Sequence, residues 1–199
     1  MGGRMLLVAA AALSLAAPGL LLAAPWQFDA EHTGVHFKVR HLMVSFVRGE
    51  FEKASGKIVY DEEDVTKSSA DIAIDAASIN TRVEKRDAHL RGPDFLDVAK
   101  YPTITFTSRK VEKAANGTLR MTGDLTIRGV TKEVVLTVEG PTPPIKDPWG
   151  NQRVGGQAST KISRKDFGLV WNAALETGGV VVGDEVEVTI DVEIYRKPG

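Results

Sequence analysis

Histidines are the side chains of this 199-residue chain with the most varied chemistry, because they bind metals and exchange protons near neutral pH. His32 and His36 stand four positions apart, a spacing that on a helix would let both reach one metal ion. Gly34 and the alternating apolar residues around it predict a strand instead, on which the two lie about 13 Å apart. One ion cannot bridge that distance, so we expect no metal site. His41 falls on the same side of this predicted strand as the alternating apolar residues. We expect it to hydrogen-bond either the polar end of a bound ligand or only a backbone group.

A second group of polar residues lies in the segment KRDAHLR. On a helix, His89 would share a face with Arg86, and Asp87 would share one with Arg91. One interpretation is a cationic cluster that receives a phosphate or another polar head group. The other is a solvated helix that carries an ordinary Asp–Arg pair.

Enzyme motifs are scarce in this chain. It has no nucleophile elbow, no HExxH and no glycine-rich phosphate loop. Asp166-Phe167-Gly168 spells the kinase magnesium triplet, but the accompanying kinase motifs are missing. We therefore expect a protein that is not an enzyme and has no cofactor.

Composition excludes further classes of protein. The chain has no cysteine, which rules out disulfides, thiolate metal sites and a lipidated cysteine anchor. Its formal net charge is −1, so it offers no basic footprint for nucleic acid.

The first 24 residues resemble a secretory signal peptide. Arg4 precedes an uncharged apolar run over residues 5–24, which ends in small residues at Ala23 and Ala24. An uncleaved membrane anchor is the alternative, because about 20 apolar residues span a bilayer. Cleavage predicts a periplasmic protein without a stable membrane anchor, whose residues 25–199 form one domain.

The rest of the chain alternates apolar and polar residues, as strands do. This pattern predicts about eight strands, near residues 32–41, 44–60, 70–76, 103–110, 118–128, 134–138, 153–163 and 185–194. One polar and one apolar face indicate an antiparallel sheet that either stacks as a sandwich or closes into a barrel.

One segment between the third and fourth predicted strands departs from alternation. Thr81-Arg82-Val83-Glu84 has the form of a capping box, so a helix is expected to start there and to end at Gly92-Pro93. A long connection over residues 164–184 has no clear period.

The inward stripes carry hardly any charge. An eight-stranded barrel is near the size at which the interior is either filled by side chains or holds one small ligand. Alternation alone favours a filled core, and a cavity with this lining would suit an apolar ligand.

Four segments in order make the chain similar to a known family. They are DAEHTGVHFKVRHLMVSFVRGEF, INTRVEKRDAHLRGPDFLDVAKYPTITF, GDLTIRGVTKEV, and ISRKDFGL followed by VGDEVEVTIDVE. Together they resemble the YceI-like lipid-binding proteins. This resemblance implies an all-β fold, an eight-stranded antiparallel lipocalin-like barrel with a short helical insertion between strands 3 and 4. It also implies a tunnel that takes a long isoprenoid or a related amphiphile, usually in the periplasm.

With that resemblance, the leading hypothesis is a soluble carrier for a polyisoprenoid or an isoprenoid-quinone-like lipid. The residues expected to line the tunnel are Phe37, Val39, Phe46, Phe51, Phe106, Leu125, Leu136, Ile162 and Trp171. Phe95 is expected to close the end near the helix, and His41, Arg86 and His89 are candidates for the polar head. The alternatives are an accessory protein or enzyme acting on an isoprenoid quinone, and a stress-linked interaction module. A homodimer is also an open alternative.

Overall fold

The computed structural model describes residues 25–175 and 178–198. The predicted signal peptide lies outside these residues. Within the described part, none of the helices has the length and the apolar character needed to cross a membrane.

The described residues form twelve strands in one antiparallel sheet. The long strands are β2 (Gly34–His41), β3 (Ser45–Phe51), β4 (Ala54–Val59), β5 (Ser69–Asp75), β7 (Thr103–Lys113), β8 (Leu119–Ile127), β9 (Val130–Glu139), β11 (Gln152–Ser163) and β12 (Val182–Arg196). The two-residue strands are β1 (Gln27–Phe28), β6 (Ile79–Asn80) and β10 (Ile145–Lys146). The helical elements are α1 (Glu84–Arg91) and the 3-10 turns η1 (Val65–Lys67), η2 (Ala76–Ser78) and η3 (Arg164–Phe167).

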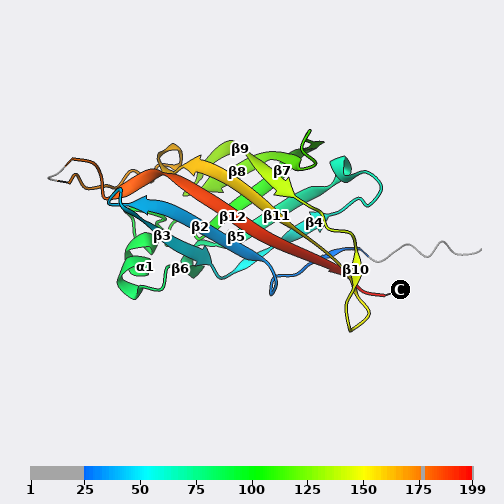
Figure 1. Cartoon of the computed structure of the whole chain (residues 1–199). Coiled ribbons are helices and arrows are strands. Elements are labelled where there is room, and N and C mark those ends of the chain that lie inside the picture. The colour runs from blue at the N-terminus through cyan, green and yellow to red at the C-terminus, as the bar shows by residue number, and fades with distance from the viewer. Residues whose placement is uncertain (1–24, 176–177, 199) are drawn as a thin grey trace, which may run out of the picture.

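The sheet is long and strongly curled (Figure 1). Its strands follow the order β4-β5-β7-β8-β9-β11-β12-β2-β3-β6, with β1 paired to β12 and β10 paired to β11. The two long strands nearest the ends of this order, β4 and β3, are consecutive in the chain and are joined only by Glu52 and Lys53. Two hydrogen bonds hold this join, from Glu52 N to Ser78 O (3.2 Å) and from Asp75 N to Lys53 O (3.0 Å).

The all-β antiparallel prediction is confirmed, but the expected count of eight strands is wrong. The predicted strand over residues 44–60 divides into β3, which pairs with β2, and β4, which pairs with β5. The chain therefore changes its hydrogen-bonding partner at Glu52 and Lys53. The three short strands lie outside the predicted runs, because two residues are too few to show a period.

The register places opposite side chains on the same face of the sheet. Phe37 lies opposite Gly49, whereas Lys38 lies opposite Arg48 on the other face. A Cβ atom at Gly49 would lie 2.5 Å from the Phe37 ring, so glycine is required to make room for this aromatic side chain. The predicted alternation is confirmed in β2 and β12, whose apolar residues face the interior.

Helix α1 is confirmed between β5 and β7, and Gly92 caps its C-terminus. The predicted capping box is wrong, because the N-cap residue is Val83 and no side chain caps the helix start. Arg82 has φ 65°, and this turn separates Thr81 from the first helical amides. Thr81 instead donates from its hydroxyl and from its backbone N (2.9 Å) to the buried carboxylate of Asp87.

Arg153 joins three segments at the end of the sheet where β10 and the C-terminus lie (Figure 1). Its guanidinium donates to Asp29 (2.7 Å), to Asp147 (2.8 Å) and to Glu193. Burial raises the pKa of Asp147, but hydrogen bonds from Arg153, Asn151 and Trp149 outweigh this effect. Together they lower the pKa from 3.8 to about 2. The pKa of Asp29 is lowered in the same way. Burial raises it, but hydrogen bonds from Arg153 and His32 outweigh this effect.

We predict that Arg153→Met lowers the melting temperature at neutral pH, because two buried carboxylates lose their cation. A carboxyl with a lowered folded-state pKa stabilises the fold above its ordinary pKa and loses this effect as the pH falls. The melting temperatures of variant and wild type should therefore converge between pH 3.8 and about 2, which thermal unfolding at a series of pH values measures. The control is Arg109→Met, which removes an exposed arginine paired with Asp124 and Glu133. A difference that stays constant across this pH range would contradict the prediction.

Candidate functional site

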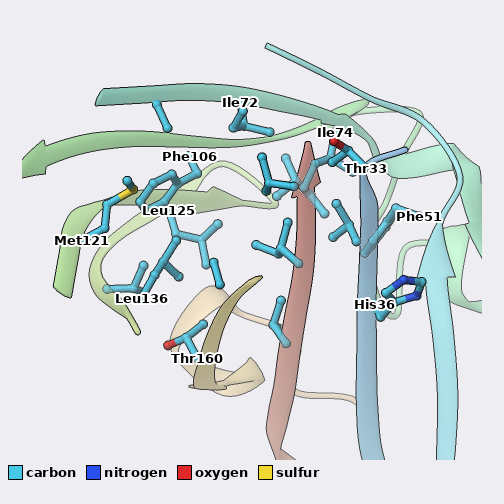
Figure 2. Close-up of a pocket in the computed structure, with 18 of the residues that line it drawn as sticks. Thr33, His36, Phe51, Ile72, Ile74, Phe106, Met121, Leu125, Leu136 and Thr160 are labelled. Atoms are coloured by element: carbon cyan, nitrogen blue, oxygen red, sulfur yellow. The ribbon is translucent and has the colours of Figure 1, made fainter. Parts of the chain in front are cut away.

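The curled sheet encloses a cavity of about 330 Å³. Figure 2 shows apolar side chains of β5, β7, β8 and β9 converging on it, among them Ile72, Phe106, Leu125 and Leu136. Each occupies an inward position of its strand, so the alternation that forms the sheet also lines the cavity. A volume of this size lies within the range of small-molecule sites.

The cavity is long and narrow. At one end it is bounded by Leu90 of α1 and by Phe95 and Phe167, and at the other by Tyr60 and Pro141. Along β12 the lining continues from Val182 to Ile194, a path of about 40 Å at the rise of an antiparallel strand. A lining that continues over such a path suits an extended chain better than a compact ring system.

Arg164 is the only Lys, Arg, Asp or Glu among the described residues that line the cavity. Its buried guanidinium donates to the carbonyl oxygens of Gly183 (2.9 Å), Trp171 (2.9 Å), Leu169 and Val182, and to the Asp184 carboxylate (3.2 Å). Burial lowers the pKa of Arg164. Because its donors are already used within the protein, this residue holds the segment after η3 against β12 and is not free to bind a ligand's head group.

The structure brings eight of the predicted site residues together around the cavity. They are Phe37, Val39, Phe51, Phe95, Phe106, Leu125, Leu136 and Ile162. His41, Phe46, Arg86, His89 and Trp171 are not among the lining residues.

Phe46 is on the outer face of the sheet, so the expectation that it lines the cavity is wrong. It lies opposite Arg40, and its ring contacts the guanidinium of that residue at 4.0 Å from the centroid. Phe46 and Phe51 are an odd number of positions apart in one strand, so they must face opposite sides. Strict use of parity within residues 45–51 would have shown this from the sequence.

His89 and Trp171 form a layer outside Phe95. The ring centroids of His89 and Phe95 are 5.0 Å apart, and those of His89 and Trp171 are also 5.0 Å apart. The His89 Nε2 atom lies 2.9 Å from a carboxylate oxygen of Asp94. Trp171 was expected in the lining, but it packs over the end of the cavity because the segment that carries it is not a strand.

Arg86 and His41 are engaged elsewhere. Arg86 donates to the hydroxyl and to the carbonyl oxygen of Thr81, both at 2.7 Å, so it stabilises the entry to α1. His41 is the last residue of β2, and its carbonyl accepts from Val44 N in the turn that follows. Its parity pointed inward, but its side chain is not among those that line the cavity, although its ladder partner Val182 is.

Sequence reasoning missed several polar members of the lining, among them Thr160, Thr33 and Arg164. Thr160 belongs to the same stripe as Ala158 and Ile162, so parity alone could have found it. Thr33, which is labelled in Figure 2, precedes β2, and Arg164 begins a 3-10 turn, so no period identifies either residue.

One group of potential metal ligands is present among the described residues. Ligand atoms of Asp29, His32 and Glu193 lie within 4.8 Å of one another. Arg153 already donates to both carboxylates, so its guanidinium supplies the positive charge that a metal ion would bring. The cluster does not fit a metal centre.

Comparison with known proteins decides the family. The profile of the YceI-like domain matches residues 26–194. The chain belongs to the YceI-like family.

Curated YceI-like relatives match over most of the chain. A UPF0312 protein of Ectopseudomonas mendocina is 38% identical over 185 residues, covering 90% of this chain and 91% of its own. A UPF0312 protein of Vibrio cholerae is 40% identical over 140 residues, covering 69% of this chain and 72% of its own.

Solved structures show the same fold. The YceI protein of Campylobacter jejuni is 36% identical with a TM-score of 0.68, covering 81% of this chain and 91% of its own. A polyisoprenoid-binding domain from Saccharophagus degradans is 18% identical with a TM-score of 0.61, covering 88% of this chain and 99% of its own. At that identity the second likeness establishes the fold alone.

We predict that Arg164→Met lowers the free energy of unfolding by about 2–4 kcal/mol, because buried carbonyl oxygens lose their donors. It should also release the segment after η3, so that the amides of Leu169 and Val181 exchange faster in hydrogen–deuterium exchange. Lys165→Met is the control, since Lys165 binds the same Asp184 (2.8 Å) from an exposed position. Equal exchange in both variants would show that Arg164 does not hold this segment.

Proposed function

We propose that this protein binds a polyisoprenoid or a similar long-chain amphiphilic lipid and carries it through the periplasm. The observation that carries the proposal is a cavity that is long, narrow and lined almost entirely by apolar side chains. Sugars and nucleotides would need many hydrogen-bond partners that this lining lacks, whereas an extended hydrocarbon needs none.

Hydrocarbon burial supplies the affinity in this proposal. Each buried CH₂ group contributes about 0.8 kcal/mol, so a tail of several isoprene units is held without a strong polar contact. Conformational ordering of the tail reduces this gain, and a narrow preformed cavity limits the further cost of reorganising the protein. Family membership supports the proposal, as does the name of the Saccharophagus domain that shares the fold.

We place the polar head group at the end of the cavity near α1. Phe95 closes the lining there, and the half-exposed imidazole of His89 lies directly outside it. A head group that emerges beside Phe95 would meet His89 before it met bulk water. Residues 1–24 act in this proposal as a cleaved export signal, which leaves residues 25–199 as the carrier.

Filling the cavity tests the proposal. Ala158 is buried in the middle of the lining, so Ala158→Trp should occupy the space of the tail and reduce co-purified lipid about tenfold, the equivalent of two lost CH₂ groups. Mass spectrometry of organic extracts from the gently purified protein measures this lipid. Ser159→Trp is the matched control, because the neighbouring residue is exposed on the outer face of the same strand.

Val188→Phe, further along the cavity, repeats the test if Ala158→Trp fails to fold, as judged by circular dichroism. A wild-type protein from which no long-chain lipid can be extracted, and which takes none up from solution, would overturn the proposal. Lipid released in a chemically altered form would favour an enzyme acting on the same ligand.

A further inference from the structure

The turn between β2 and β3 exposes three consecutive apolar side chains, which we call the apolar tip: Leu42, Met43 and Val44. Their exposed fractions are 37%, 53% and 79%, and Val170 on the segment after η3 is 64% exposed. Figure 1 shows the turn at the end of the sheet where the segment after η3 also lies. Single exposed apolar residues are common on soluble proteins, but three in succession at a projecting turn are not.

The backbone of the apolar tip makes this composition more unusual. Leu42 and Met43 have φ values of 49° and 60°, and Val44 N donates to His41 O (3.1 Å) across the turn. Turns whose two central residues both have positive φ favour Asn and Gly, because other residues in the left-handed region cost about 1–2 kcal/mol each. Polar turn residues would relieve both the strain and the exposure, so the fold alone does not explain Leu42 and Met43.

Cations surround the base of the apolar tip on the outer face of the sheet. The charged groups of Arg40, Lys38 and Arg48 lie 4.0, 5.0 and 5.8 Å from the centroid of the Phe46 ring. Within the described residues, only Lys38 of these three forms an ion pair, with Glu187 (2.8 Å). Arg40 and Arg48 form no ion pair within these residues, although Arg40 lies near enough to Glu187 to help lower the pKa of that carboxyl. Two guanidinium groups thus stand behind the apolar projection without a carboxylate bound to them.

We propose that this end of the molecule docks on the surface of an anionic phospholipid bilayer. The apolar tip enters the region between head groups and acyl chains, and Arg40 and Arg48 bind lipid phosphates beside it. An apolar projection with adjacent cations is the combination that interfacial membrane binding uses. The inference rests on the proposed function in one respect, because docking here gives a lipid a route between bilayer and cavity.

The position of the apolar tip supports this route. His41 lies opposite Val182 in the ladder, and Val182 lines the cavity. The same end carries the layer of His89, Trp171 and Phe95 that covers the cavity. A lipid that left the cavity here would enter the bilayer without crossing water.

A bilayer fits the apolar tip better than a folded protein partner does. A stable protein interface needs about 800 Å² on each side, which one projecting turn cannot supply, whereas a bilayer accepts a convex apolar tip. The opposite end also exposes apolar residues, Ile145 (64%) and Trp149 (77%). Among the described residues, both arginines near that end, Arg153 and Arg196, are already bound to carboxylates. Lys146 remains beside Ile145, but a lysine cannot form the bidentate phosphate contacts that Arg40 and Arg48 can form.

Vesicle co-sedimentation of residues 25–199 tests the proposal, since the described fold and cavity lie within this range. We expect binding to vesicles of phosphatidylethanolamine and phosphatidylglycerol, and little binding to phosphatidylcholine vesicles. Met43→Ser/Val44→Ser and Arg40→Gln/Arg48→Gln should each weaken binding at least about tenfold. The control is Ile145→Ser/Trp149→Ser, which removes equally exposed apolar residues from the other end and should leave binding unchanged.

Three results would overturn the docking proposal: no binding to anionic vesicles, equal binding to both compositions, or loss of binding only in the control. A change of oligomeric state on Met43→Ser/Val44→Ser, without vesicle binding by the wild type, would assign the apolar tip to a second copy of the chain. The cavity-filling variant Ala158→Trp separates this proposal from the proposed function, because it should still bind vesicles. Vesicle binding by a protein that carries no lipid would therefore leave the docking proposal standing while the carrier proposal fails.

Discussion

The structure depends on one constraint, the two-residue period of side chains in paired strands. Antiparallel partners hold opposite residues on the same face, so a shift by one residue in any ladder would turn an apolar stripe toward water. The unbroken ladder between β11 and β12, from Gln152↔Arg196 to Ser163↔Glu185, prevents such a shift along the length of the molecule. The inner surface follows from this register, and Arg164, the one Lys, Arg, Asp or Glu that lines it among the described residues, comes from η3 rather than from a strand.

Two arginines at opposite ends hold irregular segments on this regular sheet. Arg153 gathers carboxylates from three segments at the end near β1, and Arg164 gathers carbonyl oxygens from the segment after η3 at the other end. Loops cannot share a strand's ladder, so their polar groups need another partner when they cover an apolar interior. Arginine serves because one guanidinium offers several donors in a fixed plane.

The regular part of this arrangement was predictable from the sequence, and the irregular part was not. The stripe on β12 and the positions of Phe37, Phe106 and Leu136 follow from alternation, because the period is the cause of the burial. Arg164 and the role of Thr81 were not predictable, since their partners are carbonyl oxygens or side chains that only the turns bring near. The resemblance to YceI-like proteins supplied what alternation lacks, namely the choice of a hollow barrel over a filled core.

The join at Glu52 and Lys53 has a mechanical consequence. On the β1 side of this join, β4 lies beside β1, but in the described residues no ladder connects the two strands. Side chains span the gap instead: Glu62 accepts from Trp26 (3.3 Å) and from Arg196 (2.7 Å). Elsewhere, widening the curled sheet would have to stretch backbone hydrogen bonds. Between β1 and β4, widening needs only the adjustment of a few long side chains. The wall is therefore most compliant here, because the gap between β1 and β4 can widen without unzipping any pair of strands.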